Sequence, residues 1–160
     1  MSYHAFTIDG YGICVDDIGY VSTAALRDFI KKDPELYANV MSWLSDDTSE
    51  TKLILGDESF DDEAADLIMD EWESDDGLCT GLTPIMRSVI LALENIDLVE
   101  AVDFDGVQYL LFAPFYPWSY TTKEEKSATQ EGIQSMFEKY VGMLTDRPVK
   151  VQYYSVENGG

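Results

Sequence analysis

The chain has 160 residues and a formal net charge of -21, because 31 Asp and Glu stand against only 10 Lys and Arg. Hydrophobic residues make up 46% of it and aromatic residues 12%, which excludes the aromatic-poor composition of a disordered chain. A surface this negative argues against binding to nucleic acid or anionic membrane, and favours basic proteins as partners.

Two glycines interrupt the first β-prone segment. Aromatic and β-branched side chains from Tyr3 to Ile8 predict a strand, and a similar run resumes from Ile13 to Val15. Asp9-Gly10-Tyr11-Gly12 between them has the composition of a turn. We therefore expect an N-terminal β-hairpin.

Two helices are expected next. Ser22 or Thr23 can cap a helix that runs to Ile30, because their hydroxyl groups accept hydrogen bonds from free N–H groups of the first turn. Asp33-Pro34-Glu35 then supplies a cap, a first-turn proline and a first-turn acid. These residues predict a second helix that ends near Leu44.

The densest charge lies between Asp46 and Asp76, where fourteen carboxylates stand against one cation, Lys52. Lys52 to Leu55 within this stretch is a short apolar run that fits either a strand or a loop anchored in the core. From Ser59 onward, apolar residues recur at three and four positions, which predicts an amphipathic helix. The expected apolar face contains Phe60, Ala64, Leu67, Ile68 and Trp72, and the opposite face Asp62, Asp66, Asp70 and Glu73.

A turn and an apolar helix are expected after the acidic helix. Ser74 to Gly81 is small and polar, and it is the one place where the chain could divide into two units. Thr83-Pro84 predicts the start of a helix whose residues are nearly all apolar as far as Leu93. We expect this helix to be the buried one.

The last third of the sequence predicts antiparallel strands. Asp105-Gly106 is the strongest hairpin signal of the chain and joins strands expected at 98–104 and 107–113. A helix is expected from about Ala128 to Leu144, and alternation from Val149 to Val156 predicts a final strand. The elements together indicate a single α+β domain, in which an antiparallel sheet of hairpins packs against several helices.

Residues that would mark a catalytic site are scarce. His4 is the sole histidine and lies in an expected strand, which excludes sites built on two imidazoles. Cys14 and Cys79 form neither a CxxC pair nor a disulfide framework, and fit buried thiols in a reducing cytosol. Nucleotide-binding, metalloprotease and nucleophile-elbow motifs are absent from the sequence. We therefore expect no enzyme activity and no cofactor.

Targeting signals are absent as well. The first residues lack a basic region followed by an apolar run, and no apolar stretch is long enough to cross a membrane. We expect a cytoplasmic protein.

Carboxylates can also bind metal ions, so metal binding is a further alternative. The stretches 57–62 and 103–105 lack the ligand spacing of a calcium-binding loop. Weak binding of a divalent cation by Asp61, Asp62 and Asp66 stays open as an alternative.

The spacing of the helical carboxylates favours a different use. Residues four apart on a helix lie about 6 Å apart along its axis, so Asp62, Asp66, Asp70 and Glu73 would form a line of charges comparable in spacing to a nucleic-acid backbone. Like charges four residues apart destabilise a helix by about 0.2 to 0.5 kcal/mol per pair. A solvated face does not require such a line, because a net charge of about 2 to 8 keeps a small domain in solution. Mimicry of phosphates, or another charge-driven protein contact, is therefore the favoured interpretation.

A second candidate contact is aromatic. Tyr116 and Trp118 alternate with prolines in the segment 112–120. Aromatic side chains on a rigid loop are typical interface anchors, since they bury a large area at small entropic loss. The alternative is a loop folded back over the sheet.

The chain ends in Gly159-Gly160 after an expected hairpin, helix and strand. In these features the last third of the chain resembles the ubiquitin-like and sulfur-carrier proteins, whose C-terminal glycine is activated by adenylation. The resemblance implies an alternative function, a carrier or modifier that acts through its terminal glycine. The helices before this segment are not part of that pattern.

The chain as a whole resembles the DNA-mimicking inhibitors carried by phages and mobile elements, such as anti-CRISPR and anti-restriction proteins. The resemblance is physicochemical: small size, extreme acidity, a folded composition and missing catalytic motifs. It implies a phage protein in the host cytoplasm that fills the basic nucleic-acid-binding cleft of a nuclease, for example a CRISPR effector. The residues expected to contact the partner are Asp57, Glu58, Asp61, Asp62, Asp66, Asp70, Glu73, Asp75, Asp76, Tyr116 and Trp118.

Overall fold

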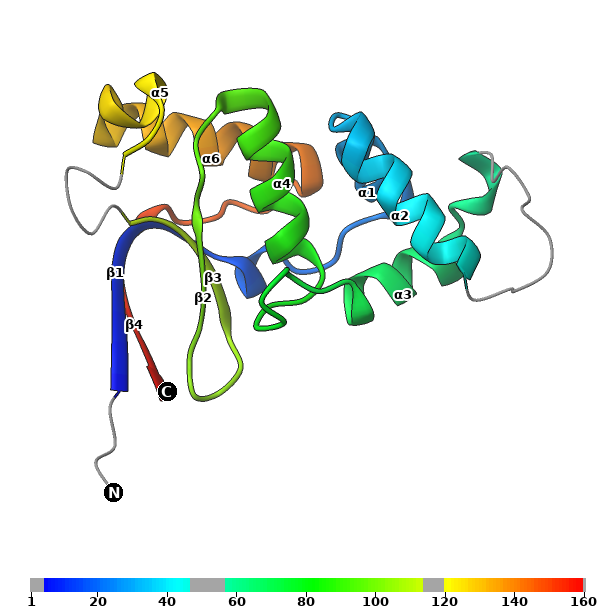
Figure 1. Ribbon diagram of the computed structural model, residues 1–160, viewed down its shortest axis with the longest axis horizontal. Helices are drawn as coiled ribbons and strands as arrows, with labels where there is room; N and C mark the ends of the chain where they lie inside the picture. The colour runs from blue at the N-terminus through cyan, green and yellow to red at the C-terminus, as the bar shows by residue number, and fades with distance from the viewer. Residues whose placement is uncertain (1–4, 47–56, 114–119, 160) are drawn as a thin grey trace.

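The computed structural model describes residues 5–46, 57–113 and 120–159. Its strands are β1 (Ala5–Cys14), β2 (Val99–Val102), β3 (Gln108–Phe112) and β4 (Gln152–Gly159). Its helices are α1 (Thr23–Ile30), α2 (Pro34–Asp46), α3 (Asp62–Glu71), α4 (Leu82–Glu94), α5 (Lys123–Lys126) and α6 (Gln130–Leu144), with short 3-10 helices η1 (Val15–Ile18) and η2 (Asp57–Ser59). The strands lie at one end of the molecule and α1, α2 and α3 at the other, with α4 between them (Figure 1). The expected α+β class is confirmed.

The N-terminal hairpin is the element that the sequence predicted wrongly. β1 is one continuous strand that runs through Gly10 and Gly12, and the sheet has the antiparallel order β2-β3-β1-β4. A Cβ atom on Gly12 would lie 2.1 Å from the carbonyl oxygen of Leu110, and one on Gly10 would lie 2.8 Å from the Cβ of Ala113. The two glycines therefore serve the close approach of β3 to β1, and not a turn.

β1 passes from one partner strand to the other along its length. Residues 5–12 pair with β4 and residues 11–14 pair with β3, so only Tyr11 and Gly12 pair with both neighbouring strands. β2 contacts β4 although they are the two edges of the sheet, which means that the sheet curls. A small apolar cluster, Ala101, Leu111, Ala113 and Val156, is buried on the side where the glycines lie, and Tyr109 and Tyr154 pack against it.

The main core joins the helices to the other face of the sheet. Its buried members come from β1, α1, α2, α3, α4, β3 and α6, so residues on both sides of the Ser74–Gly81 turn share one core. Phe29 of α1 and Tyr140 of α6 meet edge to face at its centre, with ring centroids 6.3 Å apart. α4 has seven buried residues, as its composition predicted, and five of them belong to this core, whereas Leu91 and Leu93 lie on its exposed side.

Most helix boundaries follow from their caps. The Ser22 hydroxyl accepts from the Ala25 amide at the start of α1, and the Asp33 carboxylate accepts from the Leu36 amide at the start of α2. Thr129 caps α6 in the same way, which places its first residue at Gln130. The hairpin around Asp105-Gly106 is confirmed as β2 and β3, and Gly106 has the positive φ that its turn requires.

The main differences from expectation concern α3, β4 and α5. α3 begins at Asp62 and not at Ser59, because Asp61 is its cap and η2 occupies the residues before it. β4 begins at Gln152 and not at Val149, and it extends to Gly159, which pairs with Ala5. The short α5 was not predicted, because a single turn of Lys and Glu carries no periodic apolar signal. The predicted segment Lys52 to Leu55 lies outside the described residues.

Candidate functional site

α3 presents its acidic side chains to solvent. The Asp61 carboxylate accepts from the Ala64 amide at 2.8 Å and so starts the helix. Ala64, Ala65 and Ile68 form the buried side, while all five carboxylates of the helix itself are exposed. The apolar periodicity thus places the charge of this segment on one face, as predicted.

We call Asp62, Asp66 and Asp70 the acidic row. Four-residue spacing puts neighbouring members about 6 Å apart along the helix axis. No ion pair between residues that the structure describes includes a carboxylate of the stretch 58–76. The sequence offers no Lys or Arg between Lys52 and Arg87. Among the described residues, the row has one side-chain hydrogen bond, which the hydroxyl of Thr23 donates to Asp62.

Two of the predicted contact residues have structural roles instead. Asp61 is the cap of α3, as described above. The Asp76 carboxylate accepts from the Ser74 hydroxyl at 2.6 Å and from the Leu78 amide at 3.2 Å, and so fixes the turn after α3. The hydrogen bond from Ser74 is the main cause that lowers the pKa of Asp76.

The remaining predicted residues fall in different places. Glu73 is not on α3, since the helix ends at Glu71 with Trp72 as its C-cap, and Glu73 forms a β-bridge with Thr80. Glu73 and Asp75 are exposed at the rim of a pocket described below. Asp57 and Glu58 belong to η2, where the Glu58 side chain is exposed. Tyr116 and Trp118 lie outside the described residues.

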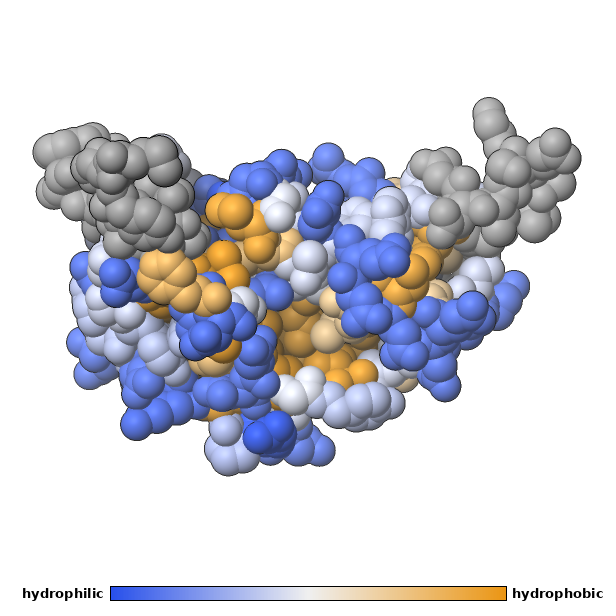
Figure 2. Space-filling model, turned by 90° about the horizontal axis from the view of Figure 1, so that it is seen from below, coloured by the Kyte–Doolittle hydropathy of each residue, from blue (hydrophilic) through white to orange (hydrophobic). Residues whose placement is uncertain are grey.

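A second acidic group was missed by the sequence analysis. Asp16 of η1 interacts with its neighbour Asp17 and with Asp103 of the β2–β3 turn; burial, followed by the charges of Asp103 and Asp17, raises the pKa of Asp16. Asp103 is at least 86 positions from the other two in the chain, so no local pattern could have found the group. Figure 2 shows the molecule from below, with hydrophilic residues on both flanks and α3 on the right. Apolar residues are visible in a hollow between the two flanks.

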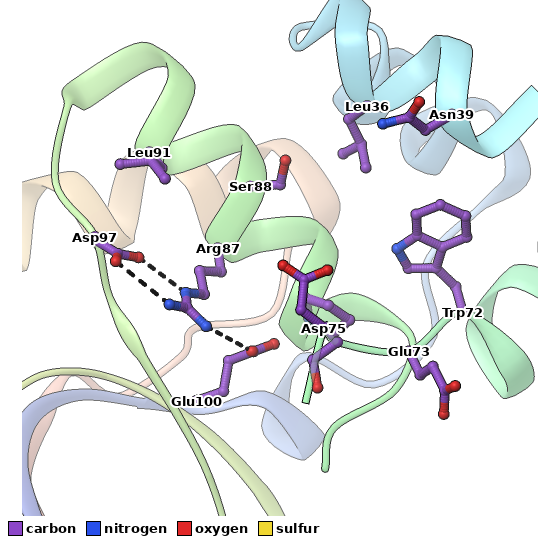
Figure 3. A pocket seen from close by; sticks show the side chains of 12 residues that line it. Leu36, Asn39, Trp72, Glu73, Asp75, Arg87, Ser88, Leu91, Asp97 and Glu100 are labelled. Atoms are coloured by element: carbon purple, nitrogen blue, oxygen red, sulfur yellow. Dashed lines mark hydrogen bonds and ion pairs between the residues drawn. The ribbon is translucent and has the colours of Figure 1, made fainter. Parts of the chain in front are cut away.

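A pocket of about 320 Å³ lies between α2, α4 and the segment that follows α3. We call it the carboxylate pocket; four of its lining residues are acids, namely Glu73, Asp75, Asp97 and Glu100. Among the described lining residues Arg87 is the only cation, and two of these acids hold it. Its Nε atom lies 2.9 Å from an Asp97 oxygen, and its Nη1 atom lies 3.0 Å from Oε2 of Glu100 (Figure 3).

Glu100 is the unusual member of this pocket. Glu100 is only 8% exposed, and its Oε1 atom is buried without a hydrogen-bond partner among the described residues. Burial raises the pKa of Glu100, while the hydrogen bond and charge of Arg87 oppose that shift. A buried carboxylate oxygen without a partner is costly. The pocket therefore has unmet capacity for a hydrogen-bond donor.

Trp72 forms the wall of the pocket opposite α4. Its ring packs edge to face against Trp43 of α2, with centroids 5.5 Å apart. Figure 3 shows Trp72 and Glu73 on one side of the pocket and Arg87, Asp97 and Glu100 on the other, with Asp75 between them.

The structure shows no metal-binding arrangement in the part of the chain that it describes. No group of three or more His, Cys, Asp or Glu side chains there is arranged to hold a metal ion, and this includes Asp61, Asp62 and Asp66. Among the same residues, no helix has both the length and the apolar character needed to span a membrane.

The two cysteines are buried thiols. Burial is the main cause that raises the pKa of Cys79 to about 12, and burial followed by the charge of Asp17 raises the pKa of Cys14. Since the thiolate is the reactive form, we expect iodoacetamide to alkylate both thiols at least about a hundredfold more slowly in the native protein than in urea. Mass spectrometry of time points checks this, and fast native alkylation of Cys79 would contradict it.

Comparisons with models of protein families, with curated proteins and with solved structures found no match for this chain.

Proposed function

We propose that the protein is an acidic inhibitor that occupies the basic nucleic-acid-binding cleft of a nuclease, or of another DNA-binding protein, by DNA mimicry. An anti-CRISPR or anti-restriction protein of a phage, acting in the host cytoplasm, would work in this way. The observation that carries the proposal is the acidic row: three exposed carboxylates at regular spacing, on a helix whose surroundings supply no neutralising cation among the described residues.

The energetics of α3 support a role beyond solubility. Like charges at this spacing weaken the helix by about 0.2 to 0.5 kcal/mol per pair, and no ion pair of a described residue compensates the row. A cleft rich in Lys and Arg would neutralise the carboxylates of the row on binding and so remove their mutual repulsion. In such a cleft each partner cation lies where a phosphate otherwise binds. Such a contact speeds association at low salt and weakens as salt rises.

The test is a neutralisation of the acidic row. Asp62→Asn, Asp66→Asn and Asp70→Asn together keep side-chain shape and the acceptor for Thr23 while they remove three charges. We expect the variant to bind its partner about tenfold or more weakly, since exposed ion pairs contribute up to about 1 kcal/mol each. The partner is captured from host lysate at low salt and identified by mass spectrometry, and the affinities are then measured with the purified protein.

The control removes the same charge from another surface. Glu131→Gln, Glu138→Gln and Asp146→Asn change three exposed acids on or next to α6, so both variants have the same net charge. This control should bind like the wild type, and double-stranded DNA should displace the wild type from the captured partner. An equal loss in both variants, or a partner that binds DNA and the protein simultaneously, would contradict mimicry.

A further inference from the structure

We infer that the carboxylate pocket receives an arginine side chain of the basic partner. This inference rests on the proposed function, because it supplies a specific anchor for the same contact. The pocket adjoins the acidic row along the chain: α3 ends at Glu71, and Trp72, Glu73 and Asp75 follow directly as pocket residues. One partner surface could therefore meet both features.

The charge of the pocket favours a cation. Its four carboxylates stand against Arg87 alone, and Arg87 already pairs with Asp97 and Glu100. Glu73 and Asp75 are exposed at the rim and take part in none of the ion pairs between described residues. A second positive charge would thus enter a site with a formal charge of -3, from four acids and one arginine.

Glu100 points independently to a missing donor. Its side chain is 3% exposed, Oε2 is bound by Arg87, and Oε1 has no hydrogen-bond partner in the described part of the chain. In Figure 3 the free end of its carboxylate is directed away from Arg87 and toward Asp75, on the pocket side. A donor placed between Asp75 and Glu100 would satisfy that oxygen, with a small movement of the rim to admit it.

The walls fit the stem and the head of an arginine. Leu36, Pro84 and Leu91 supply apolar surface for the aliphatic stem, and Trp72 offers a ring on which a guanidinium can stack. The planar guanidinium gives several donors in a fixed fork and is less strongly hydrated than an ammonium group. A metal ion is a poorer candidate, since the described residues contain no group arranged to hold one.

Binding of a small probe tests the pocket without the partner. N-butylguanidine carries the charged head and a short stem, and N-butylurea is its neutral isostere. Titrated into the wild type and followed by NMR, the guanidine should shift the Trp72 indole and Arg87 resonances with saturation, while the urea should not. Asp75→Asn should weaken the guanidine at least threefold, and Glu100→Gln at least as much. Equal binding of both probes, or of neither, would overturn the inference.

The partner then distinguishes this inference from the proposed function. The acidic-row variant should bind N-butylguanidine like the wild type although it captures less partner. Asp75→Asn, at an exposed position where folding is not at risk, should lower partner affinity at least threefold with the acidic row intact. Probe binding without any effect of Asp75→Asn on the partner would overturn the assignment of the pocket to the partner's arginine, while leaving mimicry by the row unaffected.

Discussion

Replacement of Gly12 by alanine is expected to destabilise the protein by about 3 kcal/mol or more, at the upper end of what overpacking costs. The added methyl group would lie 2.1 Å from the Leu110 carbonyl oxygen and 2.9 Å from the Leu111 Cα atom. Both neighbours are backbone atoms of β3, so no side chain can rotate away to make room. The strands would have to separate where β1 carries partners on both edges. Urea unfolding followed by circular dichroism measures the change.

Gly142→Ala is the matched control. Gly142 lies on the exposed side of α6, and nothing approaches within 4 Å of the position of its Cβ atom. Alanine there should stabilise the helix by about 0.5 to 1 kcal/mol, because it removes backbone freedom from the unfolded chain. A Gly12→Ala variant that unfolds at the wild-type urea concentration would show that β3 does not approach β1 as closely as described.

The elements that the sequence predicted are those fixed by neighbouring residues. Pro34 follows a capping aspartate, Asp105-Gly106 joins two apolar runs, and the apolar spacing of α3 is read within ten residues. Each signal acts over a few positions, and each element lies where it was expected to within a few residues. The acidic row follows from the same local pattern, once α3 is known to begin after Asp61.

β1 was misread because glycine has two uses that look alike in a sequence. Asp9-Gly10-Tyr11-Gly12 is typical of a turn, yet the reason for its glycines is the close approach of residues 110–113, which lie far away in the chain. Local composition contains no information about that contact. The distinction between a turn and a close approach is therefore made by tertiary structure.

The carboxylate pocket was invisible for a related reason. Trp72, Arg87 and Glu100 come from three successive segments, and their meeting depends on the packing of α4 against β2. One signal was nevertheless present: Arg87 is the first cation after the acidic stretch and lies on the most apolar helix. A lone arginine in such a setting requires acidic partners, and those partners are Asp97 and Glu100.

Glu125→Ala is the second substitution with a large expected effect, about 2 to 4 kcal/mol of destabilisation. Glu125 is only 6% exposed. Its Oε1 atom accepts from the Thr121 and Thr122 amides, and its Oε2 atom accepts from the Asp97 amide at 2.8 Å. Alanine would leave three backbone donors without partners, and would detach α5 from the start of the segment that leads into β2. Urea unfolding at neutral pH measures the loss.

The pH dependence of stability tests the same carboxylate, because acid protonates Glu125 and removes its charge. Burial raises the pKa of Glu125, but the hydrogen bonds from Asp97, Thr121 and Thr122 outweigh it, so the pKa lies below its ordinary value of 4.5. The stabilisation is therefore complete above pH 4.5 and is lost as the pH falls through the folded-state pKa. The free energy of unfolding of the wild type should exceed that of Glu125→Gln by less and less as the pH falls below 4.5, because the amide of glutamine is not protonated in this range. The control is Glu124→Ala, which removes an exposed neighbouring carboxylate and should change stability little at any pH. An equal loss of stability in Glu124→Ala and Glu125→Ala would mean that the buried carboxylate does not hold α5 to the segment before β2.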